Sequence, residues 1–242
     1  NLTIRNNYFA NPILVETTDG IVIDTNEFDL SNTPSNAFGI LLDGSTTNSI
    51  IEKNEINNIA NGIIIEDSDS LNNKLSQNTG TTSSLMVDLG NDGETVNDLD
   101  DVDTGENNLQ NKPEITSAQY NNSTRTVTLD GSLNTTDGIY RLDFFASNGV
   151  SQASEYISFF VDSVTNNNLS FTDREISVPV RGILPSFITA TSTDQSGNTS
   201  EHSTPLAVDS ILITSCDQLA GGNPASVANH IEDDYTAFYR LA

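Results

Sequence analysis

The chain has 242 residues, with 9 lysines and arginines against 34 aspartates and glutamates, and its formal net charge is −25. This length accommodates one large domain or two ordinary ones. A charge this negative repels phosphate and so argues against nucleic-acid binding. A single cysteine cannot form an internal disulfide, and two distant histidines, His202 and His230, exclude a histidine-rich metal site. No apolar run approaches the ~18 residues of a membrane-spanning helix.

The first hundred residues repeat a short apolar strand that is followed by polar residues and an asparagine. The asparagines are Asn7, Asn26, Asn54 and Asn78. A second series of apolar segments alternates with the first, at residues 13–15, 39–43, 62–66 and 85–88. Two short strands in every ~20–28 residues, with asparagine or glycine at the corners, are typical of a parallel β-helix.

We therefore predict an all-β fold that begins with a right-handed parallel β-helix of about four coils in residues 1–109. One coil is too small to bury its own apolar face, so coils stack and their aliphatic side chains form columns. Asparagine tolerates the left-handed backbone conformation of sharp corners, and its amide reaches the asparagine of the next coil. The repeat begins in the middle of a coil, so we expect the stack to be truncated at its N-terminal end.

Two acidic residues on the predicted coils, Asp43 and Glu66, are weak candidates for catalysis. They follow equivalent strands, so we expect them about 5 Å apart on adjacent coils. Paired carboxylates serve glycosidases, and polysaccharide lyases add a basic residue. The alternative interpretation is that both are solvated charges at strand ends, and we assign no catalytic residue.

Residues 88–113 are rich in aspartate, asparagine and glycine. Asp98, Asp100, Asp101 and Asp103 precede Gly105. Closely spaced carboxylates repel one another unless a cation lies among them, and oxygen ligands on a turn suit Ca²⁺. The spacing does not match an EF-hand loop, because the glutamate at its twelfth position is missing. Two interpretations stay open: a bound Ca²⁺ ion, or a hydrated acidic linker.

From Pro113 the pattern changes to longer alternating strands between turns, which predicts an immunoglobulin-like β-sandwich in residues 113–208. Asp194 and Glu201 flank a tight turn and form a second, weaker candidate cation site, with a plain turn as the alternative. Residues 209–242 break the pattern and are predicted to be a linker or the start of another module. The predicted sandwich core is Val127, Leu129, Tyr140, Leu142, Phe144, Ile157, Phe159, Val161, Phe187 and Ile188.

Three stretches in this order resemble a known class of proteins: residues 91–113, the segment Tyr140-Arg141-Leu142-Asp143-Phe144-Phe145, and residues 188–201. They are similar to bacterial secreted or cell-surface proteins in which parallel β-helix repeats lead into an immunoglobulin- or cadherin-like domain. The resemblance covers roughly residues 1–208 and implies a large, exported, multidomain protein. The chain departs from it at Glu106 and Lys112, where relatives more often carry Pro and Phe, and no catalytic set is carried over.

These observations favour an extracellular, non-catalytic surface or adhesion-type fragment of a bacterial protein, with a face that binds carbohydrate or another cell-surface component. One rival hypothesis is the C-terminal part of a β-helix polysaccharide lyase or glycosidase. The other is a structural spacer. The sequence does not indicate the oligomeric state.

Overall fold

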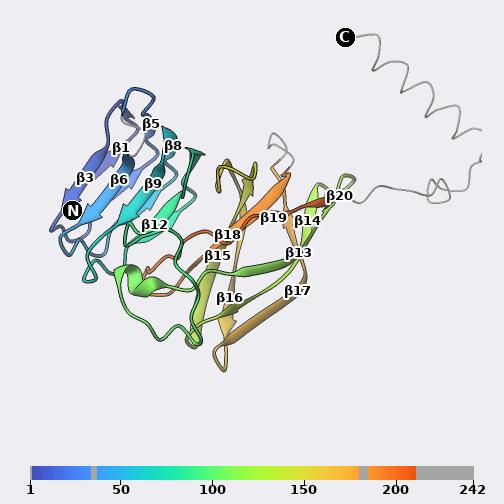
Figure 1. Ribbon diagram of the computed structural model, residues 1–242. Helices are drawn as coiled ribbons and strands as arrows, with labels where there is room; N and C mark the ends of the chain where they lie inside the picture. The colour runs from blue at the N-terminus through green and yellow to red at the C-terminus, as the bar shows by residue number, and fades with distance from the viewer. Residues whose placement is uncertain (1, 34–36, 180–184, 211–242) are drawn as a thin grey trace, which may run out of the picture. The chain divides into compact units, whose positions relative to one another are not determined.

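The structure, a computed structural model, describes residues 2–33, 37–179 and 185–210. It is an all-β fold that contains a parallel β-solenoid of about three turns and almost no helix (Figure 1). None of the described residues belongs to a helix with the length and apolar character needed to cross a bilayer. Residues 211–242, which fall in the predicted linker or further module, lie outside the described residues.

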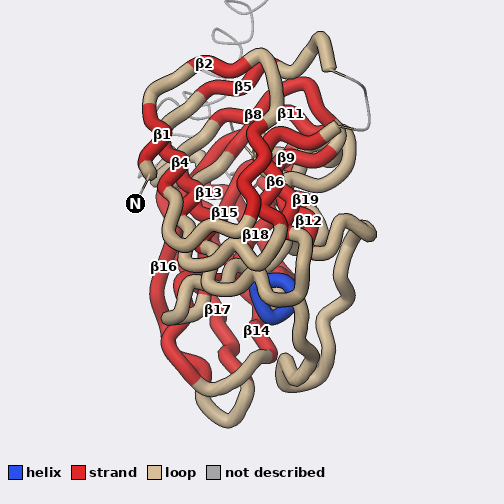
Figure 2. The backbone as a smooth tube through the Cα atoms, turned by 90° about the vertical axis from the view of Figure 1, so that its left-hand side faces the viewer, coloured by secondary structure: helices blue, strands red, loops and turns tan. Residues whose placement is uncertain are grey.

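The solenoid is built from three four-stranded parallel sheets, and one strand from each sheet makes up a rung. Figure 2 shows the strands of the second sheet stacked in the order β2, β5, β8 and β11. The first sheet contains β1 (Thr3–Arg5), β4 (Val22–Asp24), β7 (Ile50–Glu52) and β10 (Lys74–Ser76); the second contains β2 (Tyr8–Phe9), β5 (Glu27–Asp29), β8 (Glu55–Ile59) and β11 (Thr79–Thr82); the third contains β3 (Ile13–Glu16), β6 (Phe38–Asp43), β9 (Asn61–Ile65) and β12 (Val87–Leu89).

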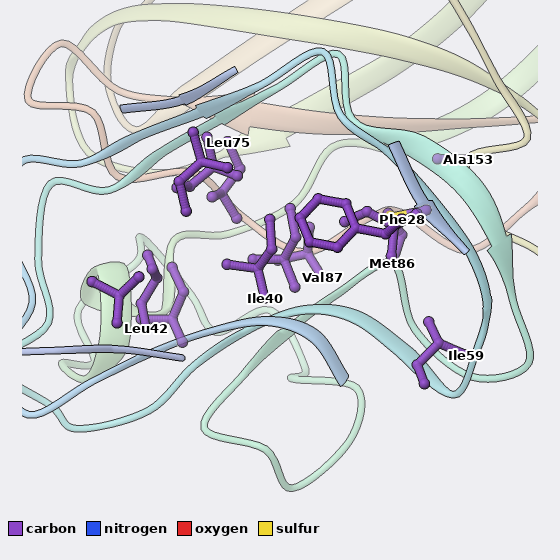
Figure 3. Packing of buried hydrophobic residues seen from close by; sticks show 14 of the residues in the cluster. Phe28, Ile40, Leu42, Ile59, Leu75, Met86, Val87 and Ala153 are labelled. Carbon is purple, nitrogen blue, oxygen red and sulfur yellow. The ribbon is translucent and has the colours of Figure 1, made fainter. Parts of the chain in front are cut away.

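The interior of the solenoid is filled by columns of aliphatic side chains, as the repeat predicts. Ile23 is in register with Ile51, and Ile40 is in register with Ile63; all four are fully buried. Phe28, Ile40, Met86 and Val87 pack close together in this interior (Figure 3). Because a single rung of three short strands cannot exclude water, the burial of each column depends on the rungs above and below it.

A ladder of asparagines runs along one corner of the solenoid and confirms the predicted contact between asparagines of neighbouring coils. Asn7, Asn26 and Asn54 each donate their backbone N–H to the side-chain oxygen of the next asparagine, at 3.0–3.1 Å, and the ladder ends at Asn78. The prediction of left-handed asparagines at this corner is wrong. The left-handed conformation falls on the preceding residues, which are Asn6, Thr25, Lys53 and Gln77.

The second half of the described chain forms two four-stranded antiparallel sheets that share one hydrophobic core. Phe160 and Phe171, from facing sheets, have ring centroids 5.4 Å apart. In order, one sheet contains β17 (Asn168–Ser177), β14 (Thr126–Asn134), β13 (Glu114–Asn121) and β20 (Asp209–Ser210); the other contains β16 (Glu155–Val164), β15 (Gly138–Ser147), β18 (Phe187–Thr193) and β19 (Leu206–Ala207).

Most of the predicted core residues of these sheets are buried, but Phe159 and Val161 are not. Their side chains are 48% and 51% exposed, and Phe160 is buried in their place. The pairing of β15 with β16 shifts register between Phe144 and Phe145. The alternation of inward and outward side chains along β16 therefore changes at this shift. Phe187 is only partly buried.

The antiparallel sheets and their loops cover the last rung of the solenoid, β10–β12, which we call the terminal rung. Each strand of this rung donates a backbone N–H to the second half of the chain: Leu75 to Thr199 Oγ1 at 3.0 Å, Gly80 to the Ala153 carbonyl at 2.8 Å, and Leu89 to Glu201 Oε1 at 3.1 Å. Phe145 and Ala153 also join the core of the solenoid. The two halves therefore form one compact unit that ends at Asp209.

We predict that Asn54→Ala lowers the free energy of unfolding by about 2–4 kcal/mol, because it leaves buried groups without partners. The Asn54 side chain accepts from the Asn26 backbone N–H and donates to the Ile23 carbonyl. Urea unfolding followed by circular dichroism measures the loss. Asn7→Ala, at the exposed end of the same ladder, is the matched control and should cost less than about 1 kcal/mol. Equal losses in the two variants would contradict a stabilising role for the buried ladder.

Candidate functional site

The acidic segment between β12 and β13 brings together three of the four aspartates predicted to bind a cation. Asp98, Asp101 and Asp103 each place a carboxylate oxygen within 4.8 Å of the others. The Oδ1 atoms of Asp98 and Asp103 are buried and have no hydrogen-bond partner among the residues that the structure describes. Asp100 lies outside this group, because its side chain accepts a hydrogen bond from Asn134. Asp98, Asp101 and Asp103 are called the aspartate cluster below.

The cluster is held in place by residues just before β13 and just after β14. Asp101 accepts hydrogen bonds from the Thr135 hydroxyl, from the Gln110 amide and from the backbone N–H of Asn111. Burial raises the pKa values of Asp101 and Asp103, and the charge of Asp98 raises both further. Carboxylates in this arrangement repel one another, and a divalent cation among them would remove the repulsion.

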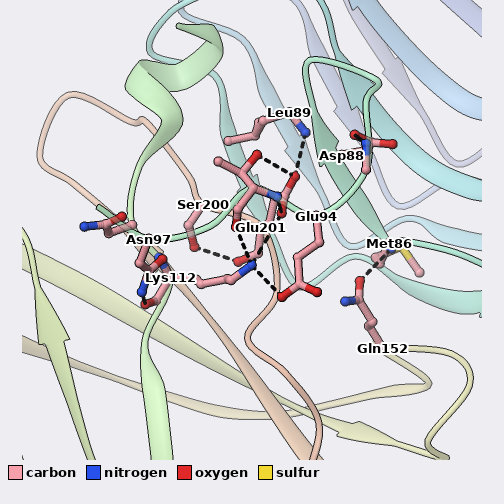
Figure 4. Close-up of polar contacts among 12 residues, drawn as sticks. Met86, Asp88, Leu89, Glu94, Asn97, Lys112, Gln152, Ser200 and Glu201 are labelled. Atoms are coloured by element: carbon pink, nitrogen blue, oxygen red, sulfur yellow. Dashed lines mark hydrogen bonds and ion pairs between the residues drawn. The ribbon is translucent and has the colours of Figure 1, made fainter. Parts of the chain in front are cut away.

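A second polar centre lies between the terminal rung and the antiparallel sheets, around Lys112 and Glu201. The Lys112 ammonium donates to Glu94 Oε1 at 2.8 Å and to the Thr95 carbonyl at 2.7 Å, and it lies 3.7 Å from Glu201 Oε2 (Figure 4). Glu201 accepts from the backbone N–H groups of Leu89 and Thr95. Its side chain therefore joins the solenoid, the acidic segment and the antiparallel sheets.

Burial raises the pKa of Glu201 to about 7, although its hydrogen bonds and the charge of Lys112 act in the opposite direction. Asp88, which precedes Leu89 on β12, is 2% exposed, and burial raises its pKa as well. The charge of Asp88 raises the pKa of Glu201 further. Glu201 thus titrates near neutral pH inside an interface that supports the solenoid.

Asp194, predicted as a partner of Glu201 in a second cation site, lies at the tight turn that the sequence indicates. Its carboxylate accepts from the backbone N–H groups of Gly197 and Asn198 and from the Asn198 amide. As far as the described residues go, neither Asp194 nor Glu201 belongs to a cluster of three or more acidic, histidine or cysteine side chains with ligand atoms within 4.8 Å of one another. The contacts of Asp194 are those of the plain turn that stood as the alternative.

A third feature is a groove on the outer side of the second solenoid sheet, which we call the polar groove. It consists of two adjoining depressions, of about 440 Å³ and about 410 Å³, which share Lys53 and Glu55. Its floor is a column of residues in register, Tyr8, Glu27, Glu55 and Thr79, one from each rung. Residues 154–156 of the second half of the chain line the end of the groove next to the terminal rung.

Tyrosines line both ends of the polar groove. Tyr8 is 61% exposed, and the pKa of its phenol is raised by desolvation and by the charges of Asp29 and Glu27. Tyr156 donates to Asp143 Oδ1 at 3.0 Å and receives a hydrogen bond from Arg141. Asp143 is fully buried, so these contacts hold the Tyr156 ring at the end of the groove.

The weak catalytic candidates, Asp43 and Glu66, lie at the end of the third solenoid sheet rather than in the polar groove. They occupy equivalent places on adjacent rungs, since the Glu66 backbone N–H donates to the Leu42 carbonyl. Asp43 accepts from the N–H of Gly44, and Glu66 accepts from the Asn91 amide at 2.5 Å. No lysine or arginine among the described residues forms an ion pair with either of them.

Sequence reasoning missed the Lys112–Glu201 centre and the part played by Tyr156 in the polar groove. Neither belongs to a repeat or a spaced motif, and Lys112 and Glu201 are far apart in the chain. The one available signal was the placement of Lys112 beside Pro113, at the point where the strand pattern changes.

Comparison with protein-family models gives no match, and comparison with the curated proteins gives none either. The fold and the geometry described above therefore define the class of the protein: an all-β protein in which a parallel β-solenoid ends against two antiparallel sheets.

The raised pKa of Glu201 predicts a specific pH dependence of stability. Because its folded-state pKa lies above the ordinary value of 4.5, its contribution to stability is full below pH 4.5 and is lost as the pH rises through about 7. Glu201→Gln cannot ionise, so the variant should gain up to about 3 kcal/mol relative to the wild type between pH 4 and pH 8. Urea unfolding across this range measures the difference; parallel pH curves for the two proteins would contradict it.

Proposed function

We propose that this chain is an extracellular, non-catalytic surface or adhesion-type fragment of a bacterial protein, and that it binds polysaccharide. In this proposal the solenoid is a right-handed parallel β-helix and the antiparallel sheets are an immunoglobulin-like sandwich. The observation that carries the proposal is the polar groove, an open surface with tyrosines at both ends and charged and amide groups between them. A few placed polar groups beside aromatic rings are typical of ligand-binding surfaces.

An enzyme acting on polysaccharides is the second candidate, because the polar groove also holds carboxylates and a lysine. Lys53 and Glu55 line both depressions. A lyase needs a base within reach of the substrate, and a glycosidase needs a pair of carboxyl groups with different proton affinities. A structural spacer would need neither a groove nor a ligand.

Binding and cleavage tests separate these functions. We expect the 242-residue chain to be retained on an array of bacterial, fungal and plant polysaccharides and to release no reducing ends from them. Release of reducing sugar, or of unsaturated products absorbing near 235 nm, would overturn the non-catalytic assignment. Absence of binding to every glycan would leave the structural spacer.

We also propose that the aspartate cluster binds Ca²⁺ and thereby rigidifies the acidic segment. The supporting observations are the closely spaced carboxylates and the two buried oxygens for which the described part of the chain offers no hydrogen-bond partner. Oxygen ligands of this kind suit Ca²⁺, and binding to the folded state alone raises its stability. The remaining ligands would come from backbone carbonyls and water.

Calorimetric melting in Ca²⁺ and in EDTA tests this proposal. At a Ca²⁺ concentration about 100 times the dissociation constant we expect a stabilisation of about 2.7 kcal/mol, or a rise in Tm of about 5–10 °C. Asp98→Asn should abolish most of the rise. Asp100→Asn is the matched control, since Asp100 faces Asn134, and it should keep the rise. Superimposable wild-type curves in Ca²⁺ and EDTA would refute the site.

A further inference from the structure

We infer that the polar groove takes an uncharged polysaccharide, and that it discriminates against acidic ones. This inference rests on the proposed carbohydrate-binding function and names both the site and the ligand class. It follows from the charges and hydrogen-bonding groups along the floor of the groove, from the rings at its ends and from its length.

The charges of the groove select against anionic ligands. Glu27 and Glu55 occupy neighbouring positions in register on adjacent strands, and both side chains are exposed. Asp29 follows in the next outward column, and Lys53 is the one basic residue among the described residues that line the two depressions. Lys53 itself lies 3.6 Å from Glu52. A uronic acid or sulfated sugar would therefore meet a net negative surface on a chain whose total charge is −25.

The same carboxylates suit hydroxyl groups. An ionised carboxylate accepts up to four hydrogen bonds, and a hydroxyl donor forms a short, charge-assisted bond with it. The lining of the groove adds amide and hydroxyl groups that both donate and accept, including Asn57, Gln77 and Thr79. A neutral sugar polymer offers hydroxyl groups in matching numbers and brings no charge that must be desolvated.

The tyrosines supply apolar contact area for the carbon–hydrogen faces of sugar rings. Tyr8 is exposed at the first rung, and Tyr156 is fixed at the far end by Asp143 and Arg141. Successive rungs lie about 4.8 Å apart, so three intervals separate Tyr8 from Thr79 by roughly 14 Å. This length fits a short stretch of a polymer rather than a single monosaccharide.

The test uses the 242-residue chain at 0.15 M NaCl, with immobilised mannan, β-1,3-glucan and dextran as neutral probes, polygalacturonate and alginate as acidic probes, and chitosan as a cationic probe. We expect binding to at least one neutral probe and none to the acidic probes. Tyr8→Ala and Glu55→Gln should each weaken this binding by about tenfold, as expected for loss of a ring contact or a charge-assisted hydrogen bond. Leu14→Ala and Glu16→Gln, exposed changes on the third sheet, are the matched controls and should leave binding unchanged.

The possible outcomes are distinguishable. Binding to acidic probes alone, or to chitosan alone, overturns the inferred ligand class and leaves the proposed carbohydrate-binding function standing. Neutral binding that survives both groove substitutions overturns the inferred site but not that function. Absence of binding to any probe overturns both.

Discussion

The structure depends on one constraint: a stack of parallel strands ends in a row of backbone N–H and C=O groups that must find partners. In the solenoid each rung satisfies the one before it, so the requirement passes along the stack to the terminal rung. There the partners come from the second half of the chain, namely Thr199, Ala153 and Glu201. Phe145 closes the apolar interior at the same end. The antiparallel sheets and their loops thus supply the partners of the terminal rung, and these contacts join the two halves into one compact unit.

This way of ending the solenoid brings charge into the interface. The N–H of Leu89 needs an acceptor, and the acceptor is the carboxylate of Glu201, which is 2% exposed. Burying an ionised carboxylate is costly unless a positive group and further donors accompany it. Lys112 and the backbone of Thr95 supply these contacts. A similar arrangement lies under the first sheet, where the buried carboxylate of Asp143 accepts from Ser76 and pairs with Arg141. Among the described residues, the Lys112–Glu201 and Arg141–Asp143 ion pairs thus each accompany a contact that caps the terminal rung.

The solenoid was predictable because its signal is repeated, whereas the contacts that end it occur once. The asparagine ladder follows from the recurrence of Asn26 and Asn54 at equivalent places. The left-handed conformation was predicted at the ladder asparagines, but it occurs at the residue before each of them. The ladder asparagines form hydrogen bonds between rungs, and the preceding residue makes the turn. Because Phe159 and Phe160 are adjacent, the sequence allows either of them to point into the core. Only the register shift between β15 and β16 decides that Phe160 does. The close spacing of the aspartates in the sequence predicted the aspartate cluster. The sequence did not predict that Asp100 would contact Asn134 and stay out of the cluster, because Asn134 is 34 positions away.

The positions of the few basic residues distinguish the aspartate cluster from the other buried carboxylates of the protein. With 9 lysines and arginines against 34 acids, most carboxylates have to be solvated. Yet the buried carboxylates of Asp143 and Glu201 each have a basic partner, Arg141 and Lys112. In the described part of the chain, no ion pair involves Asp98, Asp101 or Asp103, although two oxygens of this cluster are buried. Close carboxylates without a counter-charge repel one another and destabilise the fold that holds them together, and this contrast with Asp143 and Glu201 is the reason for proposing a cation at the cluster.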